Sequence, residues 1–289
     1  MGESNKPPYD LRRLQLMQLE ILKEVKRVCN LHGFNFFIMN GTCLGAIRHQ
    51  GSIPWDDDID IGMYAEDFDK FVKCQKDFSS QYFLQTIDTD PEFRTMIARV
   101  RLENTTIIEK EFENCDCNQG VFIDIYPLFG YPSNRIKAQL RSWESLLYRL
   151  LLAEDAPKNH GKAAILVGKT VHKIIPKGAK SHLIKVLAQK LRSESNDSEW
   201  VAFLYGMDVH LFSTIKYPRK MFEKPSMLKY EDDIFPGPTD WDGYLKLRYK
   251  DYMKLPPKEK QNSYHNFEYV DLDHSYLENK GIKYLKDKK

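Results

Sequence analysis

The clearest pattern of apolar and polar positions is a helical one near the start of the chain. In "LRRLQLMQLEILKEVKRVCNL", residues 11–31, apolar side chains recur every three or four positions: Leu14, Met17, Ile21, Val25 and Val28. This spacing predicts an amphipathic helix with one face in the core. Gly33 is expected to end it, because glycine readily adopts the left-handed conformation that follows many helices.

Short apolar runs after this helix predict three buried strands. They are "FNFFIMN" (34–40), "DIDIGM" (58–63) and "GVFIDIYPLF" (120–129), in which Asp124 interrupts an otherwise apolar run. Turn-forming residues follow the first of them, at Asn40-Gly41-Thr42. Runs of this length, rich in β-branched and aromatic residues, are typical of strands.

Other segments predict the elements between and beyond these strands. "CLGAIRHQ" (43–50) is expected to form a short helix behind the Gly41-Thr42 turn, and "EDFDKFVKCQKDF" (66–78) a second helix. "RTMIARVRLENTTIIEK" (94–110) predicts a hairpin with Asn104 near its turn.

The second half of the chain predicts a different organisation. Residues 133–156 and 161–192 are expected to form two or three helices, and an aromatic-rich, loop-rich part follows, with "FPGPTDWDGYLKLRYKDYMKLPPKE" (235–259) as its most distinctive stretch. We therefore predict an α/β (α+β) protein: a mixed-sheet core at 1–130, and a mainly helical addition with an aromatic-rich loop region at 131–289.

Composition narrows the class without identifying a function. Of the 289 residues 42% are apolar and 29% charged, which is typical of a globular protein, and the net charge of +2 gives no reason to expect nucleic acid as a partner. No apolar segment like that of a signal peptide follows Met1, and no run approaches 18 apolar residues. The five cysteines suit a reducing cytoplasm, and the role of the Cys115-x-Cys117 pair stays open.

An acidic run lies at the second predicted strand: Asp56, Asp57, Asp58 and Asp60. In an extended chain Asp58 and Asp60 share one face, because successive side chains point to opposite faces. Two carboxylates on one face repel, which raises a pKa unless a cation neutralises them, and hard oxygen ligands favour Mg²⁺ or Mn²⁺. The alternative is an acidic turn that caps a helix.

Three features combine into one site. Neighbouring strands lie about 5 Å apart, so adjacent strands ending at Gly41-Thr42 and carrying Asp58, Asp60 and Asp124 would bring the carboxylates together. Gly41 lets the backbone approach a phosphate, and the N-terminus of the following helix favours one. Three acids for a metal and a turn for phosphate are what nucleotidyl transfer needs.

The acidic motif also looks familiar. "GTCLGAIRHQGSIPWDDDIDIGM" (41–63) closely resembles the signature of the LicD family of phosphotransferases, which is itself similar to the catalytic part of fukutin-related proteins. The resemblance continues through "GVFIDIYPLF" and "YKDYMKLPP" (249–257). One departure is Lys250, where the family pattern predicts glycine, and this leaves the role of the 249–252 loop open.

The resemblance implies a nucleotidyltransferase-like fold and transfer of a substituted phosphate from a CDP-linked donor to a glycan hydroxyl. The typical donor is CDP-choline and the typical acceptor a teichoic acid or lipopolysaccharide precursor, whereas fukutin-like relatives use CDP-ribitol. By the same resemblance Asp58, Asp60 and Asp124 would be catalytic metal ligands, with Asp56 and Asp57 as further candidates. Asp124 would also orient or deprotonate the acceptor hydroxyl.

Further residues are candidates for binding the donor. Arg48 and His49 follow the Gly41-Thr42 turn and would meet its phosphates or lie on the surface. Arg99 and Arg101 are two positions apart, hence on one strand face, and would bind pyrophosphate or form ordinary ion pairs. Aromatic faces hold a quaternary ammonium such as choline. The candidates, most of which we expect in the core, are Trp55, Tyr126, Trp241, Tyr244, Tyr249 and Tyr252, and His265 is a loop histidine with either role.

One stretch bears on the acceptor. From Ala156 to Ser193 there are nine Lys or Arg and no Asp or Glu, interleaved with apolar residues. Such a segment can lie on an anionic membrane or be a solvated helix face. We therefore expect a cytoplasmic enzyme that can contact the inner face of the cell membrane and a lipid-linked acceptor. A polyol-phosphate or phosphoethanolamine transferase, and a non-catalytic nucleotide-binding scaffold, are the alternatives.

Overall fold

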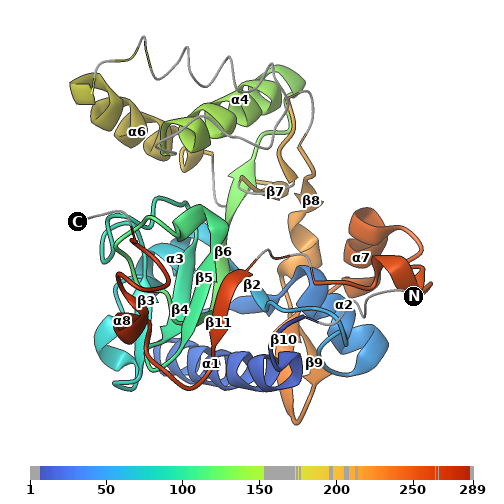
Figure 1. Ribbon diagram of the computed structural model, residues 1–289. Helices are drawn as coiled ribbons and strands as arrows, with labels where there is room; N and C mark the ends of the chain where they lie inside the picture. The colour runs from blue at the N-terminus through green and yellow to red at the C-terminus, as the bar shows by residue number, and fades with distance from the viewer. Residues whose placement is uncertain are drawn as a thin grey trace.

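The computed structural model describes residues 7–152, 173, 175, 177–194, 198–204, 208–211, 214–263, 265 and 267–286. A seven-stranded mixed sheet forms its centre (Figure 1). Five strands lie in the order β1 (Phe36–Ile38), β2 (Asp60–Tyr64), β6 (Val121–Tyr131), β4 (Ala98–Leu102) and β3 (Tyr82–Gln85). Near the end of β6, β7 (Trp200–Phe203) pairs with it, and β8 (Tyr217–Pro218) pairs with β7. The α/β fold class is thereby confirmed, and among the described strands only the pair β2 and β6 is parallel.

The first helix, α1 (Leu11–His32), packs against the sheet at β6 and β4 (Figure 1). The Asp10 side chain caps its start by accepting a hydrogen bond from the backbone N–H of Arg13. It ends as predicted at Gly33, which has φ 70. Its buried face contains most of the predicted apolar positions, and Gln15 and Gln18 are buried among them.

Three local boundaries differ from the prediction. Helix α2 (Asn40–His49) begins at Asn40, so Gly41 and Thr42 form its first turn rather than a turn before it. Strand β2 begins at Asp60, which leaves Asp58 in the segment before it. The helix expected at 66–78 is two short elements, α3 (Ala65–Phe71) and the 3₁₀ turn η1 (Gln75–Asp77).

The predicted hairpin at 94–110 is wrong. Strand β4 lies between β6 and β3, so both of its edges are occupied, and it does not pair with β5 (Thr106–Glu109). Instead β5 pairs with β11 (Phe267–Asp271) from the C-terminal region in a separate two-stranded sheet. A distant strand thus replaced the local partner, and it brings the C-terminal region next to the core.

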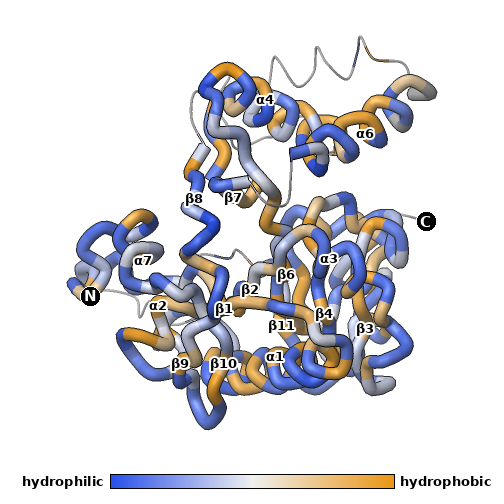
Figure 2. The backbone as a smooth tube through the Cα atoms, turned by 180° about the vertical axis from the view of Figure 1, so that it is seen from behind, coloured by the Kyte–Doolittle hydropathy of each residue, from blue (hydrophilic) through white to orange (hydrophobic). Residues whose placement is uncertain are grey.

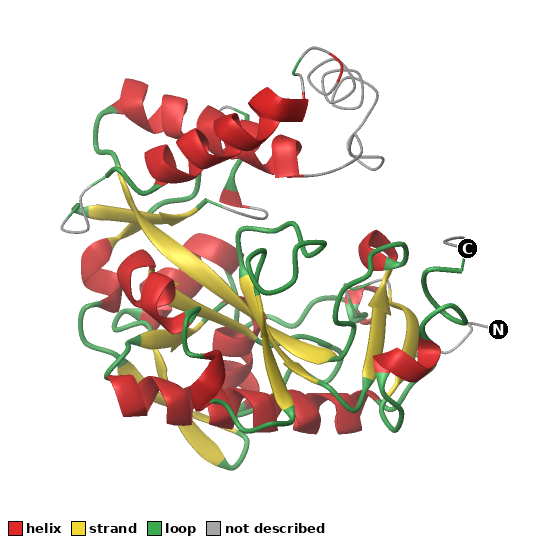
Figure 3. Ribbon diagram, turned by 90° about the vertical axis from the view of Figure 1, so that its left-hand side faces the viewer, coloured by secondary structure: helices red, strands yellow, loops and turns green. Residues whose placement is uncertain are grey.

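Two helices cover the far end of β6. They are α4 (Arg135–Leu152) and α6 (Lys177–Leu191), which pack on each other (Figures 1 and 3). In Figure 2 hydrophobic and hydrophilic residues alternate along both, as in amphipathic helices. Between them, residues 153–172, with part of the predicted basic stretch, lie outside the described residues. Among the described residues of that stretch, Arg192 pairs with Asp69 and Lys190 with Glu144.

The remaining elements flank α2 and the C-terminal region. They are η2 (Lys110–Phe112), η4 (Arg219–Phe222), the hairpin β9 (Ser226–Tyr230) and β10 (Asp233–Gly237), α7 (Trp241–Tyr249), η5 (Lys258–Lys260) and α8 (Tyr276–Asn279). The predicted division at residue 130 falls inside β6, and β7 and β8 from the second half extend the core sheet. No helix among the described residues is long and apolar enough to span a membrane.

Candidate active site

Asp60 and Asp124 lie opposite each other on neighbouring parallel strands. They are paired in register on β2 and β6, and both side chains are buried. The extended pairing continues one residue upstream, where the carbonyl of Ile59 accepts a 2.9 Å hydrogen bond from the Asp124 backbone N–H. Asp58 precedes Ile59. The structure thus brings the three predicted carboxylates to one end of the sheet.

These carboxylates are crowded and repel one another. Burial and the charge of Asp56 raise the pKa of Asp58 well above its usual range, and burial with the charges of Asp58 and Asp124 does the same for the pKa of Asp60. Burial, then Asp60 and Asp57, raise the pKa of Asp56 to about 7. Such mutual repulsion is what a bound cation relieves.

One atom of the cluster lacks a partner. Asp60 Oδ2 accepts a 2.8 Å hydrogen bond from Asn40 Nδ2, but its buried Oδ1 has no hydrogen-bond partner among the described residues. An unpaired buried carboxylate oxygen is unfavourable unless something outside the chain satisfies it. Asp58, Asp60 and Asp124 offer oxygen donors of the kind that a hard divalent cation such as Mg²⁺ or Mn²⁺ prefers. The group of three described residues at this site whose ligand atoms lie within 4.8 Å of one another is Asp57, Asp58 and His265.

The first turn of α2 positions the acids. Thr42 Oγ1 accepts the backbone N–H of Asp60 at 2.8 Å, so this buried hydroxyl fixes the start of β2. Gly41 faces Asp56: a Cβ there would lie 2.3 Å from Asp56 Oδ2. Asn40, at φ 47, is held by the Tyr244 hydroxyl, which donates to its Oδ1 and accepts from its backbone N–H. Gly41 therefore accommodates a carboxylate, a role that the sequence did not predict.

Two glutamines of α1 hold residues 53–57, the segment that contains Asp56 and Asp57, by hydrogen bonds to its backbone. Gln15 Nε2 donates to the carbonyls of Ile53 and Asp56, and Gln18 Nε2 donates to the carbonyls of Asp57 and Phe122. The sequence analysis missed both residues. Their signal was present, because they are polar residues three apart on the apolar face of a predicted helix.

A buried network centres on Asp57, whose side chain is fully buried. Its Oδ2 accepts hydrogen bonds from the hydroxyls of Tyr9 and Ser263, and its Oδ1 lies 2.9 Å from His265 Nδ1. Burial lowers the pKa of His265, but the hydrogen bond to Asp57 and the charges of Asp58 and Asp57 outweigh it and raise this pKa to about 10. His265 thus belongs to the site, while Tyr9 and Ser263 were not predicted.

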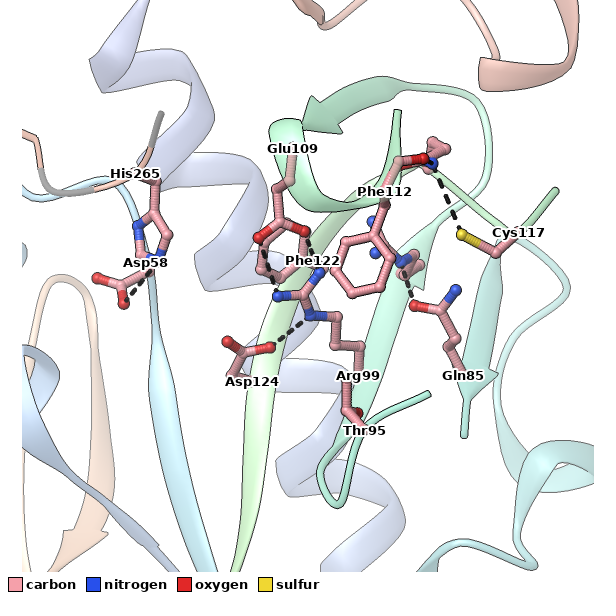
Figure 4. Close-up of polar contacts among 12 residues, drawn as sticks. Asp58, Gln85, Thr95, Arg99, Glu109, Phe112, Cys117, Phe122, Asp124 and His265 are labelled. Carbon is pink, nitrogen blue, oxygen red and sulfur yellow. Dashed lines mark hydrogen bonds and ion pairs between the residues drawn. The ribbon is translucent and has the colours of Figure 1, made fainter. Parts of the chain in front are cut away.

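The two arginines of β4 form buried contacts (Figure 4). Arg99 Nε donates to Asp124 Oδ1 at 2.6 Å, its terminal nitrogens donate to Glu109, and its guanidinium lies 3.7 Å from the centre of the Phe122 ring. Arg101 is fully buried and donates to Gln85 and to the carbonyl of Gly120. These contacts favour ion pairing for Arg99 and a structural role for Arg101.

A second cluster lies at the C-terminal end of α2. Arg48 donates to His49 Nε2 and to the carbonyl of Tyr252, and its guanidinium lies 6.0 Å from the Trp55 ring. Burial and Arg48 lower the pKa of His49. Trp55 directly precedes Asp56, so this cluster adjoins the acidic residues and suits contact with donor phosphates.

The predicted aromatic residues divide into two groups. The Tyr126 hydroxyl lies 3.5 Å from Asp124 Oδ2, and Tyr249 is 37% exposed, so both remain candidates for the donor group. Tyr244 is fully buried and the Tyr252 hydroxyl donates to Asp242, which gives both structural roles, and Trp241 is partly buried against the core.

The loop that departs from the family pattern adopts an unusual conformation. Lys250 ends α7 with φ 59 and ψ −110, a backbone conformation that favours glycine. The lysine thus occupies a position at which glycine would fit without strain.

Comparison with known proteins agrees with this geometry. Residues 33–144 match the family model described as "LicD/FKTN/FKRP, nucleotidyltransferase domain". The chain is 27% identical over 267 residues to the lipopolysaccharide cholinephosphotransferase LicD of Haemophilus influenzae, covering 88% of this chain and 96% of that protein. A segment of 61 residues is 41% identical to the ribitol 5-phosphate transferase FKRP of Homo sapiens, covering 21% of this chain but 12% of that protein. The predicted resemblance to the LicD family is confirmed, and with it the prediction of a phosphotransferase.

Proposed function

We propose that this phosphotransferase, whose residues 33–144 match the LicD/FKTN/FKRP nucleotidyltransferase family model, moves phosphocholine from CDP-choline to a hydroxyl of a cell-surface glycan precursor, with Mg²⁺ or Mn²⁺ at its acidic site. The observation that carries the proposal is the register of Asp60 with Asp124, beside Asp58. A protein that only bound a nucleotide would have little need for three carboxylates crowded at one end of its sheet.

The reaction forms one bond and breaks one. The acceptor hydroxyl oxygen bonds to the phosphorus of the phosphocholine group, the bond from this phosphorus to CMP breaks, and CMP leaves with the charge. Asp58, Asp60 and Asp124 would hold the cation, with Asp56 beside them. A bound divalent cation supplies charge neutralisation on the phosphates and makes the attacking hydroxyl more acidic.

Residues of the chain orient both substrates. Asp124, fixed by Arg99, is the carboxylate that we assign to orient the acceptor hydroxyl and accept its proton. The first turn of α2, in which the Asn40 N–H already bonds to the Tyr244 hydroxyl, would offer its other backbone N–H groups to donor phosphates. Arg48 and His49, in the last turn of the same helix, are further candidates for these phosphates. Tyr126, Tyr249 and Trp55 provide aromatic faces for the choline ammonium.

The test is CMP release from a panel of CDP-linked donors. With Mg²⁺ or Mn²⁺ present, CDP-choline should give the fastest CMP release and the largest thermal stabilisation. Faster CMP release from CDP-ribitol or CDP-glycerol would identify a polyol-phosphate transferase, an alternative supported by the similarity to FKRP. Faster CMP release from CDP-ethanolamine would identify a phosphoethanolamine transferase. Nucleotide-dependent stabilisation without CMP release, even with glycan acceptors added, would identify a non-catalytic scaffold.

A further inference from the structure

A histidine from the C-terminal region faces the acidic cluster. His265 lies just before β11, which pairs with β5, and its ring stacks on Phe267 with an interplanar angle of 8°. Figure 4 shows the ring beside Asp58, opposite the strand that carries Asp124. Phe267 thus holds the ring in place, and the ring faces Asp57 and Asp58, about 200 positions earlier in the chain.

The hydrogen bonds of Asp57 determine which nitrogen of this ring is available. An ionised carboxylate only accepts hydrogen bonds, so His265 Nδ1, 2.9 Å from Asp57 Oδ1, carries the hydrogen. Both oxygens of Asp57 already have partners, since Tyr9 and Ser263 donate to Oδ2. Asp57 therefore orients the imidazole rather than serving as a metal ligand, and Nε2, which faces Asp58, is the nitrogen that would bind a metal after releasing its proton.

The other ring nitrogen faces a predicted ligand, Asp58, with which it forms a long ion pair. His265 Nε2 lies 4.0 Å from Asp58 Oδ2, which is too long for a hydrogen bond, and one ligand atom from each of Asp57, Asp58 and His265 lies within 4.8 Å of the others. A metal-binding histidine usually donates the N–H of one ring nitrogen to a carboxylate and binds the metal through the other nitrogen. His265 has this arrangement, since Nδ1 donates to Asp57 and Nε2 faces the acidic cluster.

We infer that His265 is a nitrogen ligand of the divalent cation at Asp58 and Asp60, that Asp57 is its positioning residue, and that this ligand makes the site prefer Mn²⁺ to Mg²⁺. The inference rests on the proposed function only for the presence of a cation at the acidic cluster. Imidazole nitrogen is a good ligand for transition metals and a poor one for Mg²⁺, which favours oxygen. The nitrogen therefore distinguishes two cations that an all-carboxylate site would accept alike.

The test measures binding directly. Mn²⁺ and Mg²⁺ affinities are determined by calorimetry on the purified full chain, and pulsed electron paramagnetic resonance on the Mn²⁺ complex detects nitrogen bound to the metal. We expect Mn²⁺ to bind at least about 10-fold more tightly than Mg²⁺, with a nitrogen coupling. His265→Gln should lose the coupling and weaken Mn²⁺ binding about 10-fold or more, and Asp57→Asn should weaken it within the 10- to 100-fold range of such supporting residues.

The control is a second histidine with a similar partner. His274 Nδ1 also pairs with an aspartate, Asp271, at 3.0 Å, but it is exposed. His274→Gln should leave both affinities and the nitrogen coupling unchanged, and thermal unfolding shows that each variant is folded.

Opposite results would identify another role for His265. If it acted only as a positive counter-charge to Asp58, His265→Gln would bind Mn²⁺ more tightly, because a competing cation had been removed. That result, or a wild-type Mn²⁺ complex without nitrogen coupling, overturns the inference while CMP release still supports the proposed function. If the wild-type protein binds neither cation and releases no CMP, both ideas fail together.

Discussion

Asp56→Asn removes one charge from the acidic cluster with little change of shape. Burial and the neighbouring carboxylates Asp60 and Asp57 raise the pKa of Asp56 from 3.8 to about 7. Because the folded-state pKa is the higher one, the folded protein holds this proton more tightly than the unfolded chain does. The stabilisation is complete below pH 4 and is lost as the pH rises through about 7.

The size of the effect follows from this shift. A change of about three pKa units corresponds to about 4 kcal/mol at 1.36 kcal/mol per unit. Asp56 is partly exposed, and solvent screens its interactions, so we expect about half of that, roughly 2 kcal/mol. Without metal at pH 8, Asp56→Asn should therefore raise the melting temperature by roughly 4 to 8 °C. At pH 5 the folded protein keeps the Asp56 proton but the unfolded chain is mostly ionised, so the gain should be roughly a third of that at pH 8.

The assay is thermal unfolding of the wild type and Asp56→Asn in chelator at pH 5 and pH 8, repeated with saturating Mn²⁺. The metal should stabilise the wild type and reduce the difference at pH 8, since it neutralises the same charges. An equal gain at both pH values would point to a packing effect. No gain at pH 8 would refute the electrostatic reasoning.

Three further predictions concern separate features. Lys250→Gly should stabilise the chain by about 1 kcal/mol in chemical denaturation, because it relieves the positive φ at the end of α7; destabilisation would show that the lysine side chain matters more than the backbone. Gly41→Ala forces the Asp56 carboxylate to move, so calorimetry should show weaker metal binding, and unchanged binding would contradict the role given to Gly41. If the basic stretch contacts membranes, vesicles with anionic lipid should bind the protein at low salt and release it as salt rises. Replacement of its lysines at 169, 173, 177 and 180 by glutamine should weaken this binding, and no change would make the stretch a solvated helix face.

The local features of the site were predictable from the sequence. Helix α1 and strand β6 follow from regular apolar spacing, and the adjacency of Asp60 and Asp124 follows from two buried strands that each carry an acid. The same local reasoning placed the start of α2 too late, because Asn40 adopts a positive φ that its position after a strand did not reveal.

Long-range contacts were not predictable in this way. The pairing of β5 with β11 replaced the expected hairpin, and no spacing in one sequence indicates a partner about 160 residues away. The same pairing brings His265 to the acidic cluster. The role of Asp57 could not be predicted from the motif either, because four similar aspartates lie close together in the sequence. Only the hydrogen bonds of the folded structure show that Asp57 holds a histidine.

The central claim is that the carboxylates of β2 and β6 together carry cation-dependent transfer. The most direct measurement is CMP release from CDP-choline, with saturating Mg²⁺ or Mn²⁺, by the wild type and by Asp58→Asn, Asp60→Asn and Asp124→Asn, each shown by thermal unfolding to be folded. We expect each substitution to reduce turnover by about 100-fold or more. Turnover near that of the wild type in Asp58→Asn or Asp60→Asn, or wild-type turnover that persists in chelator, would contradict the account.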